Sequence, residues 1–136
     1  MAGKNWVCRK MKLNLPYPVS NNENTRMFNG RILTSKPAKA YKADIGWIAR
    51  VAKCPMLDGD VSLTVFLHPK MNLDGTANKN RQDLDNIFKI LLDGLNGIAW
   101  KDDKQITRIY AAVSTPVKNG GLTVIIESCE QIVMVA

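Results

Sequence analysis

Between Arg81 and Asp103 the sequence concentrates negative charge in a chain that is otherwise strongly basic. This window holds five of the twelve acidic residues in the 136-residue chain, whose formal net charge is +7. The five are Asp83, Asp85, Asp93, Asp102 and Asp103. Clustered carboxylates attract metal cations, whereas a basic surface attracts polyanions such as nucleic acids. A fold for this chain therefore has to present an acidic site within a cationic surface.

The acidic window contains a strong helix pattern. Asp83 is a favourable N-cap residue, and Asn96 with Gly97 is a typical helix end, so we predict a helix between them. At 3.6 residues per turn the apolar side chains share one face, which we expect to meet the core. They are Leu84, Ile87, Phe88, Leu91, Leu95 and Ile98. The opposite face carries Asp85, Asn86, Lys89 and Asp93.

Three carboxylates of the window, Asp83, Asp85 and Asp103, are candidate metal ligands. The first two lie at the helix start, and a turn after the helix returns Asp102 and Asp103 toward it, with Trp100 as an anchor. Carboxylates held together repel one another unless a cation lies between them. Oxygen ligands without His or Cys suit Mg²⁺ or Mn²⁺ better than zinc. The spacing therefore indicates a magnesium site.

Lys89 follows Asp85 by one helical turn and completes this constellation. A lysine beside such carboxylates can neutralise charge on a phosphate oxygen or help to deprotonate water. Ordinary structural roles explain the same residues: Asp83 as a helix cap, and Asp85 with Lys89 as a surface pair contributing about 0.2–0.5 kcal/mol. Asp93 fits a solvated helix residue or a hydrogen-bond partner of a loop, and we give it no catalytic role.

Outside the window, alternating apolar residues predict strands at 6–15 and 61–67. Ser35 and Pro37 predict the start of a helix that reaches Cys54. Its apolar stripe is Tyr41, Ile45, Ile48 and Ala52. This amphipathic helix is expected to pack on a sheet.

The end of the chain predicts two more strands, 105–115 and 122–128, joined as a hairpin by a tight turn at 118–121. An Asn-rich loop at 19–34 has room for a short hairpin. The order β-α-β-α-β-β predicts an α+β fold with one mixed sheet and two helices on one face. We expect a single domain over residues 1–136.

Composition narrows the function classes. The pI near 9.5 favours nucleic acid as a partner. Three cysteines at wide spacing, Cys8, Cys54 and Cys129, predict no disulfide framework and so a reducing compartment. His68 is the only histidine, which excludes His-based metal sites and Ser-His-Asp triads within one chain. No apolar run approaches the ~18 residues of a spanning helix, and no signal peptide is recognisable, so we expect a cytoplasmic protein without membrane contact.

At the acidic window the sequence resembles the RusA family of Holliday junction resolvases. The matching string is Asp83-Leu84-Asp85-Asn86, then Lys89, Asp93 and Leu95, then Asp102-Asp103 with Gln105-Ile106. The resemblance covers most of residues 11–128. It implies a Mg²⁺-dependent endonuclease, usually dimeric, that acts on four-way DNA junctions. It also implies that Asp83, Asp85 and Asp103 are catalytic, metal-holding carboxylates and that Lys89 is the essential base or phosphate contact.

We therefore expect a homodimeric endodeoxyribonuclease that uses Mg²⁺, or Mn²⁺ in its place, to resolve four-way junctions by paired symmetric nicks in recombination and repair. Asn86 would orient a carboxylate or a bound water. Phosphate contacts are expected from Lys70, Lys79, Arg81, Lys101 and Lys104. Two alternatives remain open: a non-catalytic nucleic-acid-binding module on the same scaffold, and a nuclease for other branched DNA such as flaps or replication forks.

Overall fold

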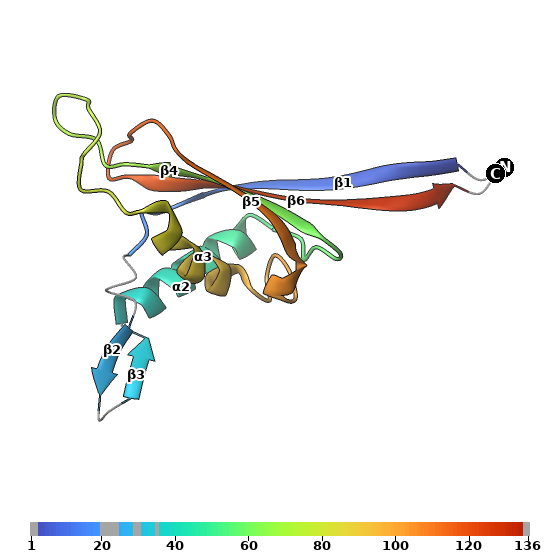
Figure 1. Cartoon of the computed structure of the whole chain (residues 1–136), viewed down its shortest axis with the longest axis horizontal. Helices are drawn as coiled ribbons and strands as arrows, with labels where there is room; N and C mark the ends of the chain where they lie inside the picture. The colour runs from blue at the N-terminus through green and yellow to red at the C-terminus, as the bar shows by residue number, and fades with distance from the viewer. Residues whose placement is uncertain (1–2, 20–24, 29–30, 35, 135–136) are drawn as a thin grey trace.

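Helices α2 (Lys36–Val51) and α3 (Phe88–Leu95) lie on one face of a four-stranded mixed sheet (Figure 1). The structure, a computed structural model, describes residues 3–19, 25–28, 31–34 and 36–134. The strands of the sheet are β1 (Gly3–Leu15), β4 (Val61–His68), β5 (Ile106–Val113) and β6 (Gly121–Met134). A separate hairpin consists of β2 (Thr25–Phe28) and β3 (Arg31–Thr34), and two 3₁₀ turns are η1 (Leu84–Ile87) and η2 (Asp103–Gln105). The predicted α+β class and the order β-α-β-α-β-β are confirmed, as is the short hairpin in the Asn-rich segment.

The strands follow the order β1-β6-β4-β5, so the predicted hairpin between the last two strands is wrong. β6 pairs antiparallel with both β1 and β4, whereas β5 pairs parallel with the far edge of β4. The segment between β5 and β6 crosses the end of β4 and bonds to it, with Ser114 N donating to Leu67 O at 2.8 Å and Val117 N to Pro69 O at 3.0 Å. Because β4 and β5 run parallel, the chain needs a crossover between them, and that crossover carries α3.

The core lies between the sheet and the two helices. On β4 every second residue is buried, from Val61 to Leu67, as its alternation predicts. The buried stripe of α2 differs from the predicted one at two positions: Ile48 is only partly buried, and Ala52 lies beyond the helix and is exposed. The stripe is Ala38, Tyr41, Ile45 and Ala49.

The ends of α2 also differ from the prediction. Ser35, the expected cap, lies outside the described residues, and the helix begins at Lys36. It ends at Val51 rather than near Cys54, because Lys53 adopts a positive φ of 56°. Cys54 N then donates to Ala49 O at 2.9 Å and Lys53 N to Arg50 O at 3.0 Å, a Schellman ending. In the described part of the chain, no helix has both the length and the apolar character needed to span a bilayer.

Beyond the four-stranded sheet, β1 and β6 continue as a two-stranded ribbon, which we call the arm (residues 3–9 and 128–134; Figure 1). Cys8 and Cys129 face each other in this register and are joined by a disulfide. The expectation of no disulfide is therefore wrong. A separation of 121 residues in sequence says nothing about distance in space when the two strands are neighbours in the sheet.

Candidate active site

Asp83 and Asp85 lie where an extended segment becomes helical. Asp83 is the last extended residue, with φ −74° and ψ 145°, and η1 follows it and runs into α3. The predicted helix is confirmed, although its first turn is 3₁₀ and it ends at Leu95. Ile87 and Leu91 are buried as expected, and so is Ile90, which the predicted apolar face omitted. These buried residues fix the backbone that presents the acidic side chains at the surface.

In the described structure no ion pair involves the exposed side chains of Asp83, Asp85 and Lys89. Asp83 occupies the predicted N-cap position, but its side chain makes no capping hydrogen bond. Among the described residues, neither Asp85 nor Lys89 takes part in an ion pair. Asp85 lies in the 3₁₀ turn η1 and Lys89 in α3, so the two residues do not share the regular i,i+4 spacing of one α-helix. Their charges therefore remain available for a ligand.

Asp103 is oriented by the core. The indole Nε1 of Trp100 donates a hydrogen bond to Asp103 Oδ1 at 2.8 Å. Trp100 is fully buried, which confirms its expected role as an anchor, while Asp103 is half-buried in η2. One carboxylate oxygen of Asp103 is thus held by a rigid donor.

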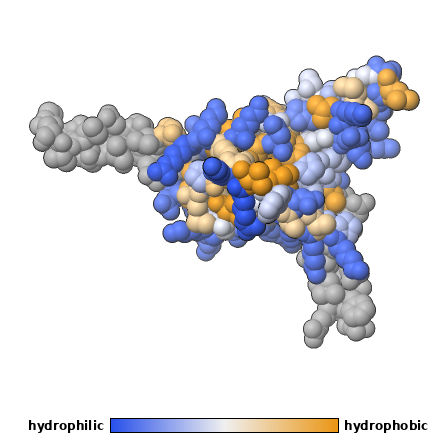
Figure 2. All heavy atoms as spheres, turned by 180° about the vertical axis from the view of Figure 1, so that it is seen from behind, coloured by the Kyte–Doolittle hydropathy of each residue, from blue (hydrophilic) through white to orange (hydrophobic). Residues whose placement is uncertain are grey.

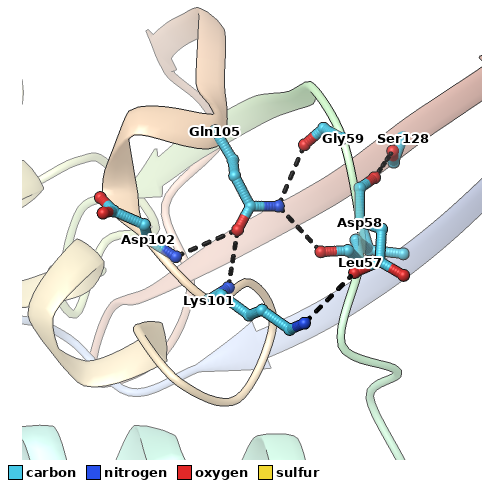
Figure 3. A network of polar contacts seen from close by, with 7 residues as sticks. All are labelled: Leu57, Asp58, Gly59, Lys101, Asp102, Gln105 and Ser128. Atoms are coloured by element: carbon cyan, nitrogen blue, oxygen red, sulfur yellow. Dashed lines mark hydrogen bonds and ion pairs between the residues drawn. The ribbon is translucent and has the colours of Figure 1, made fainter.

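Gln105 holds the turn that carries Asp103, a role that the sequence reasoning missed (Figure 3). Its Oε1 accepts from Lys101 N at 2.8 Å and from Asp102 N at 3.0 Å, and its Nε2 donates to Leu57 O at 2.9 Å and Gly59 O at 3.0 Å. Asp102 accepts from the backbone at the start of η2 and completes a capping box with Gln105. The pattern Asp-x-x-Gln before a helical turn is the local signal that could have revealed it. Asp102 is therefore a cap and not a ligand candidate.

A pocket of about 700 Å³ opens beside Asp83. Cationic and amide side chains line it together with Asp83, notably Lys70, Arg81 and Asn86. Two predicted phosphate contacts thus lie in the same pocket as a candidate catalytic carboxylate. Such a pocket combines one acidic group with a positive rim, as an anionic substrate requires.

Tyr17 lines this pocket and is held there by polar contacts, which the sequence reasoning did not predict. The Tyr17 hydroxyl accepts a hydrogen bond from Gln82 N at 2.8 Å, and Gln82 Nε2 donates to Pro18 O at 3.2 Å. Lys70 Nζ lies 5.1 Å from the centroid of the Tyr17 ring, a cation–π contact. The segment after β1 is thereby fastened to the residue that precedes Asp83.

The structure does not gather Asp83, Asp85 and Asp103 into one cage. Among the described residues, one group of three potential ligand side chains has its ligand atoms within 4.8 Å of one another. That group is Cys8, Glu127 and Cys129. Its two cysteines are joined by the disulfide, so their thiolates are not available as ligands.

Comparison with known proteins identifies the family of this site. The family model for Endodeoxyribonuclease RusA matches residues 16–127. The chain belongs to the RusA family. The crossover junction endodeoxyribonuclease RusA of Escherichia coli K12 is 34% identical over 110 residues, which cover 80% of this chain and 86% of that protein. The proteins of the same name from Enterobacteria phage 82 and Shigella sonnei Ss046 are 34% and 33% identical over the same shares.

The region that matches the RusA family contains every candidate residue of the site and leaves out the whole arm. Asp93 and His68, which lie within the match, have structural partners. Asp93 Oδ2 pairs with Lys42 Nζ at 3.2 Å and links α3 to α2 rather than to a loop. His68 bonds through Nδ1 to Thr115 O and through Nε2 to Thr123 Oγ1, each at 2.8 Å.

The predicted cationic contacts of this RusA-family chain divide into two sets. The first set precedes η1 and α3, which together we call the acidic helix, and consists of Lys70, Lys79 and Arg81. In the described structure none of these three pairs with a carboxylate. Lys101 and Lys104 lie beside Asp103, where Lys101 Nζ is 4.0 Å from Asp58 Oδ1 with both side chains largely exposed. An ion pair this long and this exposed contributes little to the stability of the fold, so Lys101 also remains available to bind phosphates.

Proposed function

We propose that this chain is a Mg²⁺-dependent endodeoxyribonuclease that resolves four-way DNA junctions by paired symmetric nicks. One observation carries the proposal: in a chain of the RusA family, the exposed residues Asp83 and Asp85 form no ion pair with any described residue, and Asp83 lines a pocket with a cationic rim. Carboxylates without structural partners beside a cationic pocket can bind the divalent cation that phosphodiester hydrolysis uses. The names of the relatives, crossover junction endodeoxyribonucleases, supply the substrate class.

The donor set fits a hard divalent cation. Asp83, Asp85 and Asp103 offer only oxygen atoms, and no histidine of the described structure lies among them. Mg²⁺ commonly binds through one or two carboxylates with waters and substrate phosphates, so a preformed three-carboxylate cage is not required. When bound, the ion supplies Lewis-acid activation of water and neutralises charge at the phosphate. We propose that Asp83 and Asp85 are ligands of the Mg²⁺ ion. The carboxylate of Asp103, which Trp100 orients, would be the third protein ligand.

The other residues of the site act on the phosphate and the attacking water. Lys89 would donate to a non-bridging phosphate oxygen, or accept the proton that the water loses. Asn86 would orient a carboxylate or that water. The five cations would hold the DNA backbone, which gives binding that weakens with salt: Lys70, Lys79, Arg81, Lys101 and Lys104.

Two symmetric nicks need two sites related by a twofold axis, because a four-way junction presents two equivalent strands. We therefore propose a homodimer, whose isologous contact would match the symmetry of the DNA. The relatives are bacterial and phage proteins named as endodeoxyribonucleases of crossover junctions, and we assign the chain to the cytoplasm, where such DNA would be met.

Asp85→Asn tests the proposal, with Asp93→Asn as the matched control. Both variants make the same chemical change, but Asp93 pairs with Lys42, whereas Asp85 forms no ion pair within the part of the chain that the structure describes. We expect Asp85→Asn to lower the Mg²⁺-dependent nicking of a synthetic four-way junction by about a hundredfold or more, with junction binding preserved. Asp93→Asn should cut at nearly the normal rate. Normal cleavage by Asp85→Asn would contradict the assignment.

A panel of substrates separates the alternatives at fixed salt. Binding without cleavage of any branched DNA would indicate a non-catalytic module. Faster cleavage of flaps or replication forks than of four-way junctions would instead indicate a nuclease with another branched substrate.

A further inference from the structure

Residues 69–81, between β4 and η1, form a projecting hairpin that we call the finger. Figure 1 shows it beyond the end of the sheet, on the side opposite the arm, and Figure 2 shows hydrophobic atoms at its outer end. Its apolar tip is Leu73, with a relative exposure of 110%, and the neighbouring Met71 is 46% exposed. A leucine this exposed contributes nothing to the core, and at the tip of a projecting hairpin it can be buried only by a partner.

The finger is held in shape by its own hydrogen bonds. Gly75 N donates to Asn72 O at 2.9 Å, which closes a turn with Leu73 at its corner. Gly75, the last residue of this loop, has a positive φ of 87°, as is common where a three-residue hairpin loop rejoins its second side. Asn72 N donates to Thr76 O at 2.8 Å and Asn78 N to Lys70 O at 2.9 Å, which pairs the two sides. The tip is thus presented in one conformation, which reduces the entropy lost on binding.

The base of the finger is tied to the body of the protein and to the site. Met71 N donates to Val117 O at 3.0 Å, which anchors one side to the loop before β6. Lys70 at one end and Arg81 at the other line the pocket beside Asp83. A DNA strand that lies in this pocket would therefore run along the finger.

The charges of the finger favour a nucleic acid at its tip. It has three basic side chains, Lys70, Lys79 and Arg81, against one acidic one, Asp74. The Asp74 carboxylate is engaged inside the turn, because its Oδ1 accepts from Thr76 N at 3.0 Å and from Thr76 Oγ1 at 2.6 Å. Cations along the stem with an apolar residue at the end are the combination that DNA-bending proteins use to enter between base pairs.

We propose that Leu73 inserts between unstacked bases at the branch point of a DNA junction, while the cations of the finger stem hold the adjacent phosphates. This inference rests on the proposed function and deepens it, because it names the residue that distinguishes a branch point from linear duplex. Bases at a junction centre are more easily separated than bases within a continuous helix, and insertion there costs less.

The test uses the full chain in EDTA and a synthetic four-way junction with 2-aminopurine next to the crossover. Unstacking of that base raises its fluorescence. The variants are Leu73→Ser, which removes the apolar tip, Leu73→Phe, which keeps it, and Val51→Ser as control. Val51 is also exposed, at 63%, but lies at the end of α2.

We expect the wild-type chain, Leu73→Phe and Val51→Ser to raise the fluorescence, and Leu73→Ser to lose most of this rise. Leu73→Ser should bind the junction about tenfold more weakly, the loss expected when a leucine no longer becomes buried, with unchanged affinity for linear duplex. Equal fluorescence and equal junction preference in Leu73→Ser would overturn the inference. So would a change of oligomeric state alone, measured by light scattering, since the tip would then contact a second copy of the chain.

Cleavage in Mg²⁺ separates this inference from the proposed function. A chain that cuts junctions without dependence on Leu73 contradicts the inference alone. A chain that unstacks the branch point through Leu73 but never cuts contradicts the nuclease and supports the inference.

Discussion

The Gln105 side chain uses both ends of its amide to join three segments of the chain beside Asp103. Two backbone donors meet its oxygen, and two backbone acceptors meet its nitrogen. No other side chain of similar size offers two acceptor sites and two donors in this geometry. Asp103 is thus held from both sides: by Gln105 through the backbone and by Trp100 through its indole.

Gln105→Ala should therefore weaken both the fold and the site. We expect the free energy of unfolding to fall by about 2 kcal/mol, because four hydrogen bonds are lost and the backbone groups are partly resolvated. Junction cleavage should fall about tenfold and need more Mg²⁺ for half-maximal rate, because Asp103 loses its fixed position. Urea unfolding and a Mg²⁺ titration measure the two effects, with Thr107→Ala as an exposed control on β5. An unchanged Mg²⁺ requirement would limit Gln105 to a role in stability.

Tyr41 makes stability depend on alkaline pH. Burial raises the pKa of its phenol above the ordinary value of 10.0, and the hydroxyl donates to Pro16 O at 2.8 Å. Because the folded pKa exceeds the unfolded one, the stabilising effect is complete below about pH 10 and is lost as the pH rises further. We expect Tyr41→Phe to be less stable at neutral pH by about 1 kcal/mol and to show a shallower alkaline decline in urea unfolding. Tyr110→Phe, the same change at an exposed tyrosine, is the control.

At the scale of elements, the close approach of α2 and α3 depends on Gly94. A Cβ at this position would overlap the side chain of Ile45 on α2. The same approach allows the ion pair between Lys42 and Asp93. The acidic helix is thus held against α2 by the absence of a side chain as well as by buried apolar residues.

Gly94→Ala should destabilise the protein although alanine favours helices. We expect a loss of about 1–3 kcal/mol from overpacking, larger than the gain of about 1 kcal/mol in helix propensity. Thermal unfolding measures the balance, and Ile45→Val in the same chain should recover part of the loss. Gly46→Ala is the matched control, because the nearest atom to its added Cβ would be the terminal Cδ1 of Ile98, at 3.2 Å, and no backbone atom would lie closer than 3.7 Å. A Gly94→Ala chain as stable as the wild type would contradict this packing.

Local periodicity predicted the helices and strands themselves better than it predicted which strands lie next to one another in the sheet. The buried positions Ile87, Leu91 and Leu95 follow from a 3.6-residue repeat, which is a property of the sequence itself. The order of strands does not, because a turn signal between β5 and β6 carries no information about β4 entering between them. For the same reason the pairing of Cys8 with Cys129 depends on a register set far away in the chain.

For the candidate site, too, the sequence predicted which residues are exposed but not which contacts they make. Asp83, Asp85 and Lys89 lie exposed on the predicted polar face, because the apolar face fixes the helix. Their lack of partners was not predictable, since it depends on the 3₁₀ turn. The contacts of Tyr17 depend on a loop that meets Gln82 across 65 residues, and single-sequence patterns do not reach that far.

At the scale of the whole molecule, the disulfide between Cys8 and Cys129 joins the two strands of the arm. It closes nearly the entire chain into one loop, with a sequence separation of 121 residues. We expect the oxidised chain to exceed the reduced one in free energy of unfolding by about 4 kcal/mol, because the cross-link restricts the unfolded state.

Urea unfolding with and without dithiothreitol measures this difference. The double variant Cys8→Ser with Cys129→Ser should match the reduced chain, and dithiothreitol should not change it further. Cys54→Ser is the control, because this free cysteine lies outside the arm. Burial also raises the pKa of the Cys54 thiol, which disfavours the reactive thiolate. Equal midpoints in the presence and absence of dithiothreitol would contradict a stabilising cross-link.

The position of β6 between β1 and β4 has a consequence during synthesis. Strand β1 is made long before its neighbour, since in the described sheet it pairs with β6 alone. The β4–α3–β5 unit, by contrast, can pair within itself while the ribosome is still adding residues. Translation therefore produces a half-built sheet with an unpaired strand edge on β4, and the nascent chain stays prone to mispairing until β6 emerges and closes that gap.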